Sequence, residues 1–171
     1  MQSVLQQIAE VLKKLLDCCS EMVRLSKDEG EVLKANDIQK LFGINETMTE
    51  NAAHLSQLEL ERAALHSVAV HKLNLSSACG LKEFLAAARS LEALDNQSGL
   101  LDEIDAIADS LSMKYKALRE QTEINQMLVR QSISYIDNFM EVLSPEYKLT
   151  YKRGGEVFRS RMLSPFVNQT V

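Results

Sequence analysis

Apolar residues recur at helical spacing along most of the chain, most clearly over residues 100–143. In the first half of this stretch they form one stripe about 100° wide, which suits packing against one neighbouring helix: Ile104, Ile107, Leu111, Tyr115 and Leu118. From Ile124 onward they spread over about 180°: Ile124, Leu128, Val129, Ile133, Tyr135, Ile136, Phe139, Met140 and Leu143. Pro145 ends the pattern, because proline cannot continue a helix. The sequence predicts one long helix with surplus apolar surface near its end.

Two long helices are predicted before it. In the first, residues 3–35, apolar positions alternate at steps of three and four, as in a coiled-coil seam: Leu5, Ile8, Leu12, Leu15, Cys19 and Met22. Ser3 with Gln6 has the form of a capping box. The seam loosens at Ser26, Glu29 and Gly30 and resumes at Val32. Asn36 is a candidate N-cap for a second helix that runs to about residue 75, so we expect an antiparallel hairpin; a slight break in one continuous helix is the alternative.

A short third helix and a tail complete the predicted organisation. The third helix is predicted from apolar residues at helical spacing: Leu81, Phe84, Leu85, Ala88 and Leu91. After Pro145 the period is lost, and the remaining residues contain Gly154, Gly155 and Pro165. We therefore predict an all-α fold with a helical-bundle domain over residues 1–144. Residues 145–171 should form a flexible C-terminal tail that orders on binding.

Composition narrows the class of protein. With 171 residues the chain is long enough for one domain with its own core. The net charge of −5 disfavours nucleic acid as a partner. Cys18 and Cys19 are adjacent and Cys79 is the third cysteine, so no disulfide framework is expected and the thiols indicate the cytoplasm. We expect no secretion signal and no stable membrane insertion, because charged residues interrupt the apolar runs.

Residues that could support catalysis are not arranged for it. Glu50 and His54 share a helix face, but the paired Glu-x-x-His pattern of a diiron bundle is missing. His66 and His71 are five residues apart, about 140° around a helix, and do not converge on one metal. Cys79 has no histidine nearby in sequence and is interpreted as a small packing residue. We expect neither an enzyme nor a cofactor or metal.

The surplus apolar surface after Ile124 has two interpretations. The first is ordinary core, covered by another helix or by a second subunit, as in a homodimeric coiled-coil scaffold. Alternatively it is a groove for the amphipathic helix of a partner, a standard mode of peptide recognition. Met140 suits the second interpretation, since its flexible thioether adapts to different partners.

Three stretches together resemble the FlgN family of flagellar export chaperones. The first is Leu33-Lys-Ala-Asn-Asp37-Ile-Gln-Lys-Leu41 after a long helix, and the second is Leu58-Glu59-Leu-Glu61-Arg62-Ala-Ala-Leu65. The third and most specific is an ordered set: Leu118-Arg119, Asn125, Leu128, an apolar helix, Tyr151 and Gly154.

This resemblance implies a STAT-like bundle of long antiparallel helices with a left-handed twist and no catalysis. Its implied clients are flagellar hook-associated proteins, held by their helical ends and delivered to the type III export gate and the ATPase complex. The expected client-binding residues are Ile124, Asn125, Leu128, Ile133, Ile136, Met140 and Leu143. For Tyr151 the resemblance implies docking on the export gate, with a tail tyrosine of no special role as the alternative.

Overall fold

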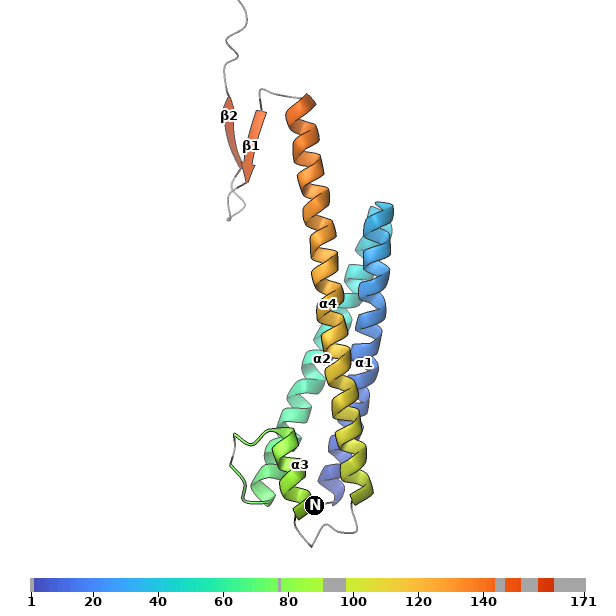
Figure 1. Cartoon of the computed structure of the whole chain (residues 1–171), viewed down its shortest axis with the longest axis vertical. Helices are drawn as coiled ribbons and strands as arrows, with labels where there is room; N and C mark the ends of the chain where they lie inside the picture. The colour runs from blue at the N-terminus through green and yellow to red at the C-terminus, as the bar shows by residue number, and fades with distance from the viewer. Residues whose placement is uncertain (1, 77, 91–97, 144–146, 152–156, 162–171) are drawn as a thin grey trace, which may run out of the picture. The chain divides into compact units, whose positions relative to one another are not determined.

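The computed structural model describes residues 2–76, 78–90, 98–143, 147–151 and 157–161, which form four helices and two strands. Figure 1 shows them in chain order: α1 (Gln2–Ala35), α2 (Ile38–Lys72), α3 (Leu81–Ser90), α4 (Ser98–Leu143), β1 (Tyr147–Tyr151) and β2 (Val157–Arg161). The chain divides into two compact units, residues 1–125 and 126–171, and the division falls inside α4.

The predicted all-α bundle and its N-terminal hairpin are confirmed. α1 ends at Ala35 and α2 begins at Ile38, so the chain reverses over two residues. The N-cap of α2 is Asp37 rather than the predicted Asn36: the Asp37 carboxylate accepts the backbone N–H of Lys40 at 3.2 Å. Asn36 instead has a φ of 57°, a left-handed conformation that asparagine tolerates better than most residues. One residue therefore turns the chain and the next caps the helix.

Helix ends differ slightly from the sequence prediction. α1 already includes Gln2, so Ser3 lies within its first turn instead of capping it. α2 stops at Lys72, three residues before the predicted end. α4 starts at Ser98, two residues earlier than expected, and ends at Leu143 as predicted.

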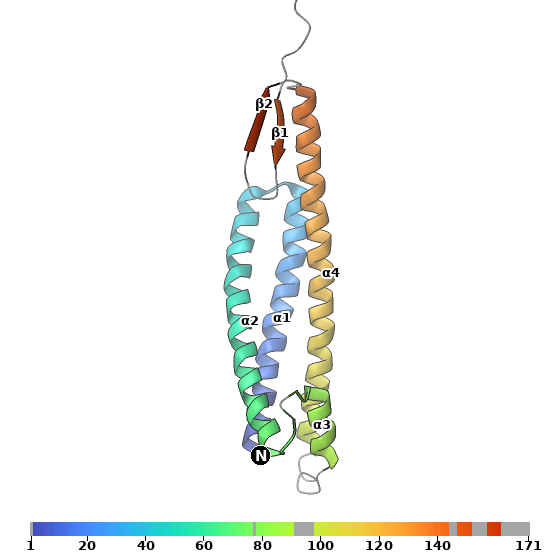
Figure 2. The ribbon, with the colours of Figure 1, turned by 90° about the vertical axis from the view of Figure 1, so that its left-hand side faces the viewer.

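The core of the first unit draws side chains from all four helices. Figures 1 and 2 show α1, α2 and the first part of α4 side by side. Leu12 and Leu15 of α1 belong to the same apolar cluster as Leu58 of α2, which confirms the predicted pairing of the two seams. The side chains that are almost fully buried include Leu5, Ile8, Leu12, Leu15, Phe84, Leu85, Leu101 and Ile104.

A half-buried polar triad ties α2 to α4. The Tyr115 hydroxyl donates to Glu59 Oε1 at 2.8 Å, and Arg62 Nε donates to the other oxygen of that carboxylate at 2.7 Å. Burial, reinforced by the bond to Glu59, raises the pKa of Tyr115 well above its ordinary value. The phenol therefore remains a proton donor at neutral pH, and the Glu59 charge has two partners in place of bulk water.

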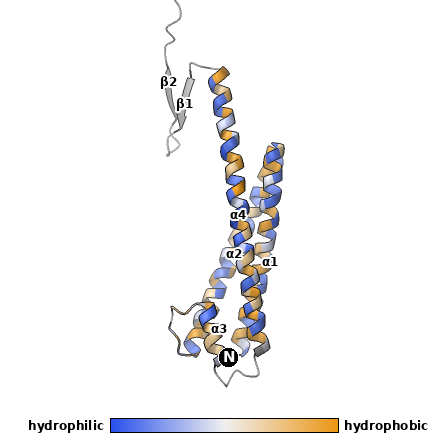
Figure 3. Cartoon of the chain, viewed as in Figure 1, coloured by the Kyte–Doolittle hydropathy of each residue, from blue (hydrophilic) through white to orange (hydrophobic). Residues whose placement is uncertain are grey.

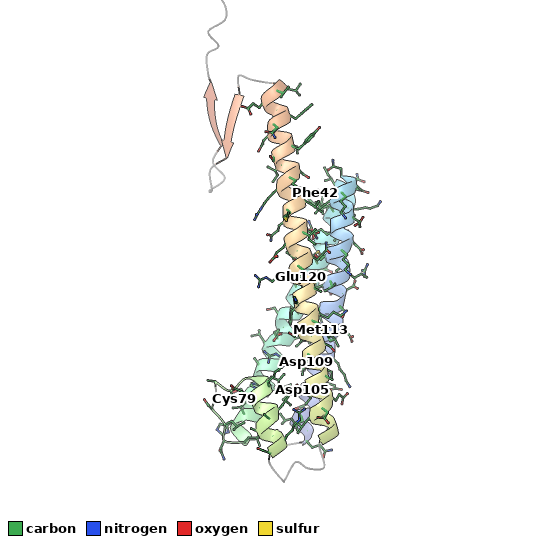
Figure 4. The ribbon with its side chains drawn as sticks, viewed as in Figure 1. Phe42, Cys79, Asp105, Asp109, Met113 and Glu120 are labelled. Carbon is green, nitrogen blue, oxygen red and sulfur yellow. The ribbon has the colours of Figure 1, made fainter. Side chains whose placement is uncertain are left out.

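α3 is held mainly by apolar contacts. Phe84, Leu85 and Ala88 are buried in the core, and the Phe84 ring meets the edge of His66 with centroids 5.6 Å apart. Around this contact Arg89 pairs with Asp102 and Asp105, and Lys82 pairs with Asp109. Figure 4 labels Asp105 and Asp109 on the stretch of α4 beside α3. Because exposed ion pairs contribute about 0–1 kcal/mol each, they orient α3 more than they stabilise it.

The second unit contains the last turns of α4 and an antiparallel β-hairpin. In the hairpin, Tyr147 pairs with Arg161 and Tyr151 pairs with Val157. The sequence pattern predicts no regular element in residues 145–171, so this hairpin is an addition. The flexibility of that region, and a domain boundary after residue 144, stay predictions; the compact units meet at residues 125 and 126.

Among the helices that the structure describes, none combines the length and the apolar character that crossing a membrane requires.

Replacing Leu12 by Ala tests the packing of the hairpin core. Leu12 is 1% exposed, so the truncation should leave a cavity and lower the free energy of unfolding by about 2–5 kcal/mol. Leu60→Ala is the control, since Leu60 is 72% exposed and its truncation should change stability by less than about 0.5 kcal/mol. Urea unfolding followed by circular dichroism gives both values, and equal effects would contradict this description of the core.

Candidate functional site

The last turns of α4 expose an unusually long row of large apolar side chains. We call the surface formed by the following residues of α4 the apolar arc: Ile124, Leu128, Val129, Ser132, Ile133, Tyr135, Ile136, Phe139, Met140, Val142 and Leu143. Figure 3 shows apolar colour recurring along these turns. Apart from the half-buried Leu128, the exposed fraction of its apolar side chains ranges from 39% at Val129 to 80% at Val142, with Ile136 at 57%. Exposed apolar surfaces of this extent mark binding sites in folded proteins.

Most of the residues predicted to bind a client lie in this exposed arc. Their side chains are between 47% and 61% exposed: Ile124, Ile133, Ile136, Met140 and Leu143. Leu128 is half-buried. The spacing of apolar residues therefore located a surface that the described residues of the chain leave exposed, and its role in client binding stays a prediction.

The arc presents aromatic and aliphatic side chains and few polar groups. Tyr135 and Phe139 stack along the helix, with ring centroids 6.5 Å apart and planes 10° from parallel. Ser132, one polar residue within the arc, donates its hydroxyl to the Leu128 carbonyl at 3.0 Å. This hydroxyl keeps its hydrogen bond inside the helix when an apolar partner covers the arc. Covering the arc therefore leaves no unpaired hydroxyl at Ser132.

Asn125 stands where the first unit ends, and it faces the bundle. Its side chain is 3% exposed. The amide nitrogen donates to the Ser26 carbonyl at 2.6 Å and to Glu29 Oε2 at 2.7 Å, while the amide oxygen accepts from Gln121 Nε2 at 3.0 Å. Every polar atom of the Asn125 side chain is thus satisfied within the first unit. Of the predicted client-binding residues, it is the one used inside the bundle.

Gly30 makes room for this network. A Cβ at Gly30 would lie 2.7 Å from Asn125 Oδ1 and 3.2 Å from Gln121 Nε2. The glycine therefore permits a close approach of α1 to α4. In the sequence, Ser26, Glu29 and Gly30 show only as a loosening of the first seam. The interruption of the first seam, together with Asn125 among the helically spaced apolar residues of α4, is the sequence signal for a buried polar contact.

Reactive chemistry is not assembled in the described part of the chain. No group of three or more His, Cys, Asp or Glu residues could hold a metal ion within the described ranges. Cys18, Cys19 and Cys79 are free thiols. Burial raises the pKa of the Cys18 and Cys19 thiols, which keeps them in the unreactive protonated form. Tyr151, the other predicted site residue, is the last residue of β1.

The first unit is a helical bundle, and its last helix, α4, continues into a row of exposed apolar side chains. Residues 1–157 match the FlgN protein family, and the chain belongs to that family of flagellar export chaperones. Membership implies a chaperone role in flagellar biogenesis and export, with hook-associated proteins as the family's clients. No curated protein and no solved structure shows significant similarity to the chain.

Gly30→Ala tests the contact between α1 and α4, and Gly43→Ala is its matched control. Both glycines lie inside helices, but a Cβ at Gly43 meets nothing within 4 Å. Gly43→Ala should stabilise the protein by up to about 1 kcal/mol. Gly30→Ala should destabilise it, since displacing Asn125 leaves buried polar groups unpaired at about 1–3 kcal/mol. Thermal unfolding of the two variants gives the comparison, and equal shifts in Tm would contradict the network.

Proposed function

We propose that this protein is a cytoplasmic export chaperone that holds the terminal helix of a hook-associated protein on the apolar arc. Bound in this way, the client would be kept from premature assembly until it reaches the type III export gate. The observation that carries the proposal is the exposure of the arc, in which Ile133, Ile136 and Met140 are each about half exposed. Membership in the FlgN family supports the same role.

The chemistry of the arc suits an amphipathic helix. Over residues 126–143 the charged side chains are Arg130, Asp137 and Glu141, and their spacing places them on the opposite face of the helix. A client helix would therefore meet aliphatic, aromatic and thioether groups. Burying one such side chain completely contributes about 1.5–3 kcal/mol. Several half-exposed ones together can exceed the cost of association, which is about 4–15 kcal/mol.

Different clients can use the same arc because its members differ in stiffness. Met140 has a flexible thioether chain, whereas Ile133 and Ile136 are β-branched and hold their rotamers. The rigid residues supply defined ridges and the methionine fills the remaining gaps. In this proposal Asn125 acts indirectly, because its hydrogen bond to Ser26 holds α4 against α1 just before the apolar arc continues along α4.

Delivery is proposed to use a separate surface. The export gate, with proteins of the ATPase complex, would recognise the tail through Tyr151. Support comes from the position of Tyr151 outside the arc, at the end of β1. A client on α4 and a receptor on the tail would then bind together.

Replacing both Ile136 and Met140 by Asp tests client binding. The two side chains are 57% and 47% exposed, so the carboxylates remain hydrated and helical content should change little. Binding of a hook-associated protein's terminal helix should fall by at least about 100-fold, because the charges would be desolvated in the complex. Circular dichroism and isothermal titration calorimetry measure the two effects.

The control carries two aspartates elsewhere, at Leu60 and Met113. Both positions are strongly exposed, and Figure 4 labels Met113 on α4 well before the arc. This control should bind the client normally. If the Ile136 and Met140 variant unfolds while the control does not, the arc is core, as in a homodimeric scaffold. Light scattering would then show the native protein as a tight dimer.

Tyr151→Ala tests the assignment of the second surface. The variant should bind the terminal helix with unchanged affinity but should be captured less well by the purified export-gate protein. Tyr147→Ala, at the other end of β1, is the control and should behave as the native chain in both assays. Loss of client binding with an unchanged gate interaction would reverse the two assignments.

A further inference from the structure

From Leu128 to Leu143 the apolar arc consists of two parallel rows of residues, and each row has heptad spacing. The first, which we call the aromatic seam, contains Leu128, Ser132, Tyr135, Phe139 and Val142. The second, the aliphatic seam, contains Val129, Ile133, Ile136, Met140 and Leu143. Both advance by steps of four, three, four and three, and each member of the second directly follows a member of the first. One such seam is what a helix presents to one partner helix.

From this pattern we propose that the arc binds two helices at once, so that its partner is a two-helix unit and not a single amphipathic helix. This inference rests on the proposed function and specifies the partner of the same site. Neighbouring residues are about 100° apart around a helix. A single helix lying in one seam would leave the other exposed to water.

The faces that continue into these seams already pack on two different neighbours within the first unit. Counting back from Ser132 of the aromatic seam in steps of seven residues gives Asn125, Leu118, Leu111 and Ile104. Asn125 is hydrogen-bonded to Ser26 of α1. Similar steps back from Ile136 reach Tyr115 through Val129 and Thr122. Those from Ile133 reach Asp105 after three exposed polar residues, Gln126, Arg119 and Ser112.

Tyr115 and Asp105 contact the other neighbours of α4. Tyr115 is bonded to Glu59 of α2 and Asp105 to Arg89 of α3. α4 thus uses one face for α1 and the adjacent face for α2 and α3. After Asn125 both faces continue with apolar residues, so a two-helix partner continues the packing that the bundle has established.

The residues that flank the two seams differ in charge. Arg130 and Asp137 flank the aliphatic seam on its outer side, whereas Gln131 and Asn138 flank the aromatic seam. Flanking residues of this kind set partner choice in coiled coils. The helix on the aliphatic seam should therefore carry an acidic residue opposite Arg130 and a basic residue opposite Asp137. The helix on the aromatic seam should have uncharged polar flanks.

A second copy of this chain fits the arc less well. In an antiparallel pair with Ile136 opposite its own copy, Arg130 lies level with Val142, and Asp137 lies level with Tyr135. The flanking charges then meet no opposite charge. One seam of each copy would also remain open. The seam left open in each copy, rather than the charges in this one register, favours a different chain as the partner.

The test compares two variants of matched design in calorimetric titration with an intact hook-associated protein. Tyr135→Asp with Phe139→Asp disrupts the aromatic seam, and Ile136→Asp with Met140→Asp disrupts the aliphatic seam. Each variant should weaken binding by at least about tenfold, or about 1.4 kcal/mol. Ser134→Asp, on the polar face of the helix, should bind within about twofold of the native protein.

The second measurement maps which residues of the arc the client covers, and it does not use the aspartate variants. In a Cys79→Ser background, Ile133→Cys and Val142→Cys place one thiol at each edge of the arc, about 180° apart around the helix. In the complex both thiols should lose reactivity with a maleimide, with one client bound per chain. One helix, about 10–12 Å across, cannot cover both edges.

The alternative outcomes are distinct. If one seam alone is sensitive and one thiol alone is protected, the partner is a single helix, and the proposed chaperone function stands while this inference fails. If the client binds and neither seam matters, the proposed binding site itself is wrong. Protection of the thiols in the free protein, or a dimer that covers one seam of each chain, would show a different occupant and also overturn the inference.

Discussion

The contact on which the rest of this structure depends is the buried amide of Asn125 against α1. An amide at 3% exposure is costly unless its donors and acceptor are paired, and Ser26, Glu29 and Gln121 pair them all. This pairing works in one register of α4 on α1, and Gly30 leaves the space for it. Apolar packing alone would tolerate a slide by a turn. Such a slide would break the hydrogen bonds of Asn125, so these bonds fix where the bundle-facing part of α4 ends.

The long elements could be predicted because hydrophobic spacing dictates them. Leu12, Leu15 and Leu58 lie in one cluster, as their heptad and helical periods required, and Pro145 marked the end of α4 correctly. The N-cap was misplaced by one residue because Asn36 and Asp37 both suit a cap, and only backbone geometry shows which one turns the chain. The strands after Pro145 were missed because five-residue segments carry little periodic signal, even though Tyr151 and Val157, the closest pair of the hairpin, are near each other in sequence.

Part of the candidate site could also be predicted. The widening of the apolar pattern after Ile124 marked the residues that prove to be exposed, including Ile136 and Met140. The role of Asn125 inside the bundle could not be predicted, because its partners lie about a hundred residues earlier and look like mere interruptions of a seam. Periodicity identifies a face that must be covered, but it does not distinguish cover by the same chain from cover by another.

The uninterrupted course of α4 has a consequence for how this chain can change over evolutionary time. One helix from Ser98 to Leu143 carries both the faces that pack in the bundle and the apolar arc. Inserting or deleting a single residue near Asn125 would turn every later side chain by about 100° and break the shared heptad phase. Length changes within this helix should therefore be accepted almost only in steps of seven residues, whereas the loops before it are free of that rule.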